Sequence, residues 1–157
     1  MSRFNGVHHL SMSVPSLAAA RAFYVELMGF SEVFDYAWSG SRAMDELTGL
    51  AGSAGRMMFL DAGNLLLEVF EYESPTPQAV RPDGDVRHFG YTHLCLDVDD
   101  AVAAYERLKA AGVRFHSAPM VSDHVVTVYG IDPFGNVFEL QQIKAESIPS
   151  RVLRSAG

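Results

Sequence analysis

Apolar and polar residues alternate along two stretches of the chain that resemble each other. Each stretch begins with a histidine, His9 in the first and His93 in the second. Apolar side chains then fall at every second position, as Leu10, Met12 and Val14 and as Leu94, Leu96 and Val98. A period of two is that of a β-strand with one apolar face. Both histidines are therefore predicted to lie on the opposite, polar face, which lines a cavity or faces solvent.

Each predicted strand is followed by a helical pattern and then by three strand-like runs. Capping residues precede the helices and glycines end them: Ser13 or Ser16 with Gly29, and Asp99 or Asp100 with Gly112. The strand-like runs span residues 30–36, 56–60 and 65–72, and then residues 113–116, 125–131 and 137–143. This internal repeat predicts an α+β fold of two βαβββ modules that form a curved, barrel-like cup of mixed sheet.

The modules set the predicted domain organisation. Residues 1–157 are expected to form a single domain, with module one at 5–72, a linker at 73–88, module two at 89–143 and a C-terminal tail at 144–157. Module one also carries an insertion at residues 37–55, which is rich in glycine and serine but contains apolar anchors such as Trp38. A long loop with apolar anchors is expected to form a lid or a pocket wall.

Composition narrows the class of protein. With 157 residues, 48% of them hydrophobic, the chain can bury a compact core without disulfides. Cys95 is the only cysteine, which excludes a disulfide within the chain and favours a reducing, cytoplasmic location. The sequence has neither an apolar signal region nor a membrane-spanning apolar run, so a soluble protein is expected. A net charge of −7 with scattered Lys and Arg argues against nucleic acid as a partner.

The polar strand face supplies the candidate chemistry. Each module offers one histidine on its first strand and one glutamate on its last, so a pseudo-twofold arrangement of the modules would gather His9, Glu68, His93 and Glu139. Imidazole nitrogens and carboxylate oxygens suit Zn, Ni, Co, Mn or Fe, and four protein ligands on an octahedral ion leave two positions for water or substrate. These residues are predicted to bind one divalent metal ion per site.

Structural interpretations of the same residues stay open. A strand histidine is more often a hydrogen-bonded structural residue than a ligand, and a buried glutamate can be neutralised by an arginine instead of a metal. Among the other polar residues, His8 is expected on the helix side of its strand, Glu71 and Glu73 in solvent, and Cys95 as a small packed thiol.

Four motifs between Val7 and Ile143 resemble those of a known group. They are Val-His-His9-Leu-Ser-Met-Ser-Val, Ala-Phe23-Tyr24-Val-Glu-Leu-Met-Gly29-Phe30, Gly-Tyr-Thr-His93-Leu-Cys-Leu-Asp-Val and Asp132-Pro-Phe-Gly135-Asn136-Val-Phe-Glu139-Leu. Together they resemble the vicinal oxygen chelate superfamily, which includes glyoxalase I, methylmalonyl-CoA epimerase, extradiol dioxygenases and antibiotic-resistance proteins. The same fold hosts several activities, so the motifs indicate the superfamily more closely than the reaction.

The resemblance implies a ligand set when it is carried over motif by motif. His9, His93, Glu68 and Glu139 match the four-ligand pattern of glyoxalase I. The resembling epimerases usually have glutamine where Glu68 stands, and the ring-cleaving dioxygenases resemble a site with two histidines and one carboxylate. No cluster of basic residues is present for the carboxylates of glutathione, and the insertion at 37–55 is unlike a minimal bacterial glyoxalase I.

The leading hypothesis is a metal-dependent isomerase or lyase of glyoxalase I-like type. Its metal would chelate vicinal oxygens of a small carbonyl or hydroxy-acid substrate and stabilise an enediolate or enolate, with Glu68 and Glu139 as candidate catalytic bases. One alternative is an Fe(II) or Mn(II) extradiol-type dioxygenase that uses His9, His93 and Glu139. Another is a non-catalytic ligand-binding or resistance protein. In each case a small molecule is the expected partner, without nucleic acid or membrane, and the chain is expected to form a homodimer.

Overall fold

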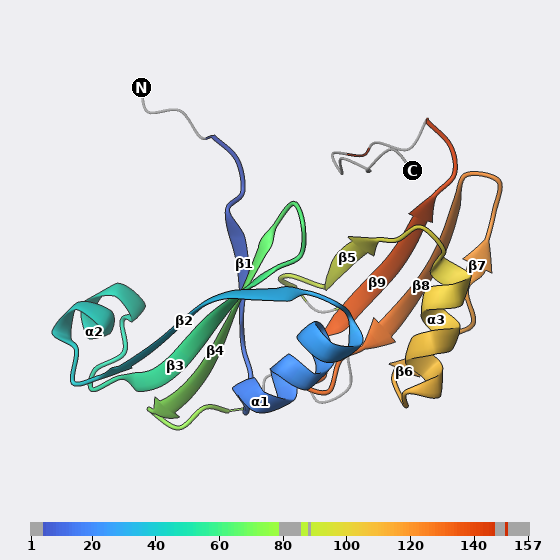
Figure 1. Cartoon of the computed structure of the whole chain (residues 1–157). Coiled ribbons are helices and arrows are strands. Elements are labelled where there is room, and N and C mark those ends of the chain that lie inside the picture. Colours follow the sequence, from blue (N-terminus) through green and yellow to red (C-terminus); the bar gives the residue numbers. More distant parts are fainter. Residues whose placement is uncertain (1–4, 79–85, 88, 147–149, 151–157) are drawn as a thin grey trace. The chain divides into compact units, whose positions relative to one another are not determined.

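The chain forms two compact units that divide between Gln78 and Ala79 (Figure 1). The computed structural model describes residues 5–78, 86–87, 89–146 and 150. Residues 79–85 and 88 of the predicted linker, and residues 147–149 and 151–157 of the predicted tail, lie outside the described residues. No helix of the described segments is long and apolar enough to cross a membrane.

Unit 1 contains a mixed four-stranded sheet and follows the predicted βαβββ order. Its elements are β1 (His9–Ser13), α1 (Leu17–Ala20), η1 (Arg21–Leu27), β2 (Ser31–Ser39), α2 (Arg42–Thr48), β3 (Ala54–Asp61) and β4 (Leu66–Ser74). The strand order is β1-β4-β3-β2, with β1 parallel to β4 and the remaining neighbours antiparallel. One sheet face meets α1 at β3 and β4, and the side chains of Met58, Leu60, Leu67 and Val69 are buried in the sheet.

The first helix begins at a serine cap and changes its winding after one turn. The Ser16 hydroxyl accepts a hydrogen bond from the Ala19 backbone N–H at 3.2 Å. From Arg21 the helix is π-helical, and the Met28 N–H donates to the Phe23 carbonyl, five residues back, at 3.0 Å. Gly29, with φ of +86°, then ends the helix in the left-handed conformation that glycine adopts without a steric penalty.

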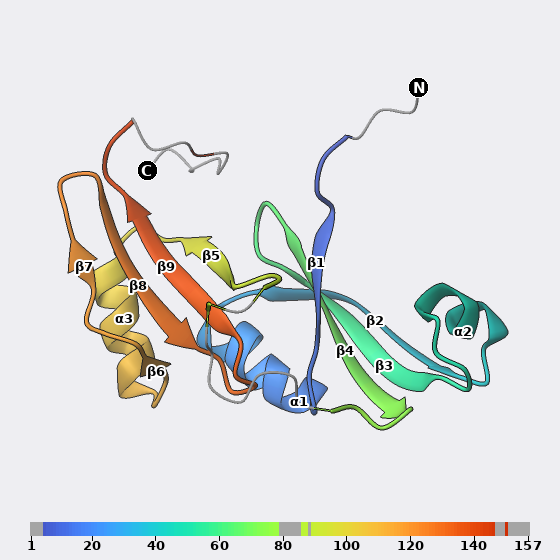
Figure 2. The ribbon, with the colours of Figure 1, turned by 180° about the vertical axis from the view of Figure 1, so that it is seen from behind.

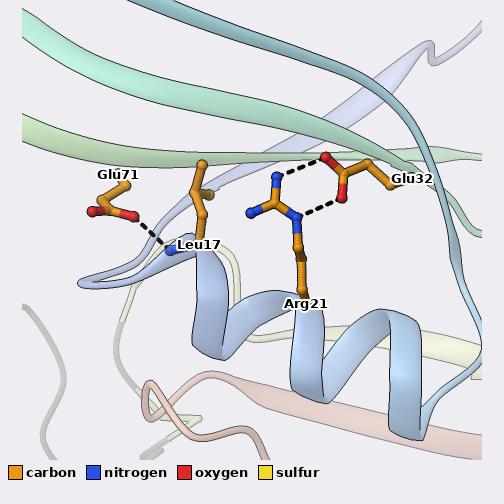
Figure 3. A network of polar contacts seen from close by, with 4 residues as sticks. All are labelled: Leu17, Arg21, Glu32 and Glu71. Atoms are coloured by element: carbon orange, nitrogen blue, oxygen red, sulfur yellow. Dashed lines mark hydrogen bonds and ion pairs between the residues drawn. The ribbon is translucent and has the colours of Figure 1, made fainter.

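Two acidic side chains hold this helix to the sheet (Figure 3). Glu71 of β4 accepts a hydrogen bond from the Leu17 backbone N–H at 2.6 Å, and its second oxygen lies 2.7 Å from Nη2 of Arg56. Glu32 of β2 accepts two hydrogen bonds from the Arg21 guanidinium, at 2.6 and 2.7 Å. The expectation that Glu71 lies in solvent is therefore wrong, because the sheet face opposite Glu68 turns toward the start of the helix. Glu73 is exposed, as expected.

Unit 2 repeats this plan with small differences (Figure 2). Its elements are β5 (His93–Asp97), α3 (Ala101–Ala110), β6 (Arg114–Phe115), β7 (Met120–Val121), β8 (Val125–Ile131) and β9 (Val137–Ile143). The strand order is β5-β9-β8-β6, β7 also pairs with β8, and β5 runs parallel to β9. Asp100 caps α3 by accepting from the Ala103 N–H at 2.9 Å, and Gly112 follows its end with φ of +89°. The predicted α+β class and the two βαβββ modules are confirmed.

The insertion of unit 1 is an ordered hairpin extension rather than one long loop. Strand β2 continues to Ser39, helix α2 follows, and β3 already begins at Ala54. Trp38 is 5% exposed, contacts the rings of Phe70 and Tyr72 edge-on, and donates from Nε1 to the Ser53 hydroxyl at 3.0 Å. The expectation of a long loop is wrong, because the β2–β3 pairing extends into the insertion and Trp38 anchors it to the sheet.

Candidate metal centre

In unit 1, strand pairing places His9 beside Glu68. Strand β1 lies parallel to β4 with Ser11 opposite Glu68, so His9 and Glu68 point to the same sheet face. The His9 Nε2 atom lies 3.4 Å from the Glu68 Oε2 atom. The Glu68 side chain is 14% exposed and that of His9 is 38% exposed. This face is the one opposite the helix, as the alternation of β1 predicts.

In unit 2, the same register places His93 beside Glu139. Cys95 lies opposite Glu139 in the parallel pair β5–β9, and the His93 Nε2 atom lies 3.1 Å from the Glu139 Oε2 atom. The Glu139 side chain is again 14% exposed, and that of His93 is 25% exposed. Each unit therefore presents one imidazole nitrogen and one carboxylate at equivalent positions of its sheet.

The structure brings the predicted site residues together as two pairs. His9 lies with Glu68 and His93 with Glu139. Among the described residues, no cluster of three or more His, Cys, Asp or Glu side chains could hold a metal ion. The assembly of all four residues around one ion stays a prediction.

The second nitrogen of each histidine also has a polar neighbour. The His93 Nδ1 atom lies 2.9 Å from the Thr92 hydroxyl, and the His9 Nδ1 atom lies 2.8 Å from the His8 Nδ1 atom. Such a partner fixes the ring and leaves Nε2 as the nitrogen directed toward the carboxylate. His8 is exposed and its ring also meets Phe59, a neighbour of Glu68 in the sheet. The expectation that His8 faces the helix is wrong, because regular strand geometry starts only at His9.

A hydroxyl group donates a hydrogen bond to each carboxylate. The Ser11 hydroxyl donates to Oε2 of Glu68, and the Thr127 hydroxyl donates to Oε1 of Glu139. Both donors lie on the same sheet face as the carboxylate they contact. Neither was singled out from the sequence, because both sit at unremarkable strand positions.

Aromatic rings flank both pairs at equivalent positions. Phe59 of β3 lies opposite Glu68 and its ring centre is 5.5 Å from that of His9. Tyr129 of β8 lies opposite Glu139 and its ring centre is 4.8 Å from that of His93. Desolvation and the nearby charge of Glu139 raise the pKa of Tyr129, so its hydroxyl stays protonated at neutral pH. Each ring lies on the strand that a predicted hairpin joins to the strand of the glutamate. The pairing within that hairpin was therefore the sequence signal that could have indicated both rings.

Cys95 shares this sheet face but is exposed rather than packed. Its thiol lies 3.3 Å from the Gln141 side-chain oxygen. Partial desolvation and the charge of Glu139 raise the pKa of Cys95 to about 12, so the group is a neutral thiol at physiological pH. A neutral thiol is a poor nucleophile.

Comparison with known proteins gives a consistent family. The family model described as "Glyoxalase/Bleomycin resistance protein/Dioxygenase superfamily" matches residues 6–140. A 2-epi-5-epi-valiolone epimerase from Actinomyces sp. is 32% identical over 88% of this chain and 80% of its own length. The uncharacterized protein YaeR of Escherichia coli K12 is 28% identical over 69% of this chain and 72% of its own length.

Solved structures agree on the fold. A glyoxalase family protein from Bacillus cereus superposes with a TM-score of 0.82 at 18% identity, covering 92% of this chain and 97% of that one. The fosfomycin resistance protein FosX from Listeria monocytogenes superposes with a TM-score of 0.60 at 19% identity, covering 89% of this chain and 94% of that one. At these identities the likeness establishes the fold alone.

Proposed function

Because the chain belongs to the glyoxalase/bleomycin resistance protein/dioxygenase superfamily, we propose that it is a metal-dependent isomerase or lyase acting on a small carbonyl or hydroxy-acid substrate. One observation carries the proposal. At equivalent positions of both units, a histidine of the first strand directs Nε2 at a glutamate of the last strand, at 3.4 Å for His9 and Glu68 and 3.1 Å for His93 and Glu139.

The donor groups fit a divalent metal ion. Each pair offers one carboxylate and one imidazole, which binds metal in its neutral form. Together the two pairs make a mixed nitrogen and oxygen ligand set that suits Zn, Ni, Co, Mn or Fe, with His9, Glu68, His93 and Glu139 as its members. The proposal requires the two pairs to meet at one ion, either within one chain or between two chains. When bound, such an ion polarises substrate oxygens and lowers the cost of negative charge on them.

The two glutamates are the proposed proton carriers. A carboxylate oxygen of Glu68 or Glu139 would take a proton from the carbon beside the substrate carbonyl and return it. The histidines would bind the metal ion through their Nε2 atoms. The rings of Phe59 and Tyr129 flank the histidines and would limit the access of water to this proton.

One relative supports a proposal of proton transfer rather than oxygen chemistry. The relative from Actinomyces sp. is by name an epimerase, and its match covers most of both chains. Inversion of a stereocentre beside a carbonyl needs a base that removes a proton and an acid that returns one, and this chain offers two carboxylates for these roles. Glu68 stands as a second carboxylate beyond the two-histidine, one-carboxylate set of a dioxygenase-type site.

Metal analysis followed by two turnover assays tests the proposal. Protein purified without chelators should contain close to one divalent ion per site, and His93→Ala should lose most of it. His124→Ala is the matched control, because His124 is exposed in the hairpin before β8. Full metal occupancy in His93→Ala would show that the ligand set is wrong.

The turnover assays separate the reaction classes. Small carbonyl and hydroxy-acid compounds incubated with the metal-loaded protein in D2O should exchange the hydrogen beside the carbonyl. Oxygen uptake without such exchange would favour a dioxygenase. Ligand binding with neither exchange nor oxygen uptake would favour a binding or resistance protein.

A further inference from the structure

Ser11 and Thr127 each donate a hydroxyl hydrogen bond to one of the two proposed ligand carboxylates. We infer that they are positioning residues that orient Glu68 and Glu139 for metal binding. The inference rests on the proposed function, because it assigns these hydroxyls a role only through the carboxylates they contact. Neither Ser11 nor Thr127 belongs to the predicted ligand set.

Strand register shows that the two hydroxyls lie on different neighbours of the strand that carries the glutamate. Ser11 lies on β1, the parallel neighbour of β4, directly opposite Glu68. Thr127 lies on β8, the antiparallel neighbour of β9, two residues before the residue that faces Glu139. The donors therefore occupy different positions of the repeated module.

The counterparts of these donors in the other unit are not hydroxyl residues. Cys95 stands opposite Glu139 where Ser11 stands opposite Glu68, and a thiol is a weaker donor than a hydroxyl. Met57 stands in unit 1 where Thr127 stands in unit 2, each two residues before the aromatic residue opposite the glutamate. The units differ at both positions, yet each supplies a hydroxyl to its carboxylate. We expect this pattern if each carboxylate requires a hydroxyl donor. A general preference of strands for threonine would not explain Ser11.

The geometry at Glu139 indicates how the hydroxyl acts. Thr127 donates to Oε1, while Oε2 lies 3.1 Å from the His93 Nε2 atom. The hydrogen bond thus restrains rotation of the carboxylate and keeps the second oxygen beside the imidazole. At Glu68 the hydroxyl of Ser11 and the His9 Nε2 atom share Oε2. A carboxylate held before the metal arrives loses less conformational freedom on binding, and removal of such an outer contact weakens metal affinity about 10–100-fold.

Four variants and a control test this inference. Thr127→Val removes the hydroxyl and keeps the shape and the β-branched side chain, and Ser11→Ala removes the other hydroxyl. Thr127→Ser and Ser11→Thr keep a hydroxyl at each position. Thr48→Val is the control, since the Thr48 hydroxyl donates to the Met44 carbonyl in α2 and contacts neither carboxylate.

The measurement is the affinity of metal-free protein for Co²⁺ alone. The visible absorption of the bound Co²⁺ reports the binding. Thr127→Val and Ser11→Ala should each bind Co²⁺ about 10–100-fold more weakly than the wild type, while Thr127→Ser, Ser11→Thr and Thr48→Val stay within a few-fold of it. Melting temperatures measured without metal identify any variant whose fold is impaired. If the variant at one position is impaired, the Co²⁺ affinity of the variant at the other position tests the inference. Wild-type affinity in both well-folded Thr127→Val and Ser11→Ala would overturn the inference and leave the proposed function standing. Failure of the wild type to bind Co²⁺ would overturn both.

Discussion

Glu71 links strand β4 to the first turn of helix α1. Its carboxylate accepts from the Leu17 N–H, one of the backbone donors that a helix start leaves without a partner inside the helix. The bond to Leu17 is the main reason why the pKa of Glu71 lies below its ordinary value, and the bond to Arg56 adds to it. Side chains on neighbouring strands can thus act as helix caps, which a search for capping residues along the sequence misses.

Removal of this carboxylate should destabilise unit 1. Glu71→Ala should lower the free energy of unfolding by about 1–2 kcal/mol at pH 7, because it leaves the Leu17 N–H without its acceptor. Glu71→Gln should cost less, since the amide oxygen can still accept. Urea unfolding of both variants measures the difference. Glu73→Ala is the control on the same strand, because Glu73 is exposed, and an equal loss there would contradict the capping role.

The ion pair of Arg21 and Glu32 should make stability depend on pH. Hydrogen bonding to Arg21 lowers the pKa of Glu32 below its ordinary value of 4.5. A group with a lowered folded-state pKa stabilises the protein above its unfolded-state pKa, and this stabilisation is lost as the pH falls through the folded-state value. The wild type should therefore exceed Glu32→Gln in stability by about 0.5–1 kcal/mol at pH 7, and the gap should narrow below pH 4.5 and close as the pH falls through the lowered folded-state pKa. Glu46→Gln, in the exposed Arg42–Glu46 pair, should show a smaller gap at pH 7.

At the scale of elements, the β2–β3 hairpin shows how an insertion is built into a sheet. Trp38 fills the space above Gly55, where a Cβ atom would lie 2.6 Å from the Glu71 carbonyl oxygen and 2.9 Å from the indole ring. Within α2, the Asp45 carboxylate accepts from the backbone N–H groups of Gly52 and Ser53, which follow the helix, at 2.8 and 2.7 Å. Packing at Trp38 and hydrogen bonding at Asp45 thus secure the two ends of the insertion.

Truncation of Trp38 should therefore affect stability rather than only ligand binding. Trp38→Ala should lower the free energy of unfolding by about 3–5 kcal/mol, since it empties a buried aromatic site and removes the hydrogen bond from the indole to the Ser53 hydroxyl. Leu47→Ala is the control in the same insertion, because Leu47 is 80% exposed, and its effect should stay within about 0.5 kcal/mol. Chemical denaturation measures both. Near-wild-type stability of Trp38→Ala would contradict the anchoring role.

Repeated elements were predictable because two signals agree at each of them, the alternation of apolar residues and the equivalent position in the internal repeat. Hydrophobic alternation gives the strands, and the bounds of β8 and β9 match the predicted runs at residues 125–131 and 137–143. Helix α2 was missed because its seven residues between glycines carry no apolar stripe long enough to identify a helix. The histidines and glutamates were found by residue type and repeat position. Ser11, Thr127, Phe59 and Tyr129 depend on which residues face each other across strands, and strand register is not fixed by the pattern of one strand.

At the scale of the whole molecule, the expected homodimer remains a prediction. Strand β2 is an edge of its sheet, and Val33, Phe34 and Tyr36 on it are each about half exposed. An edge of this kind is usually covered by other chain segments or by another molecule. Sedimentation at micromolar concentration should give close to twice the chain mass of 17.2 kDa. A sedimenting species of 17.2 kDa that retains its metal would contradict the dimer and would require all four ligands to come from one chain.

The π-helical segment η1 reconciles two module copies of unequal length. In unit 1 the glycine that ends the helix lies thirteen residues after its cap, from Ser16 to Gly29, whereas in unit 2 it lies twelve residues after, from Asp100 to Gly112. A turn closed over five residues takes up more chain than a turn closed over four. The additional residue is therefore absorbed by looser winding, and the cap and the terminating glycine keep their places in both modules. The repeat accommodates this length mismatch inside a helix, with no change in the order or pairing of the strands that carry His9 and Glu68.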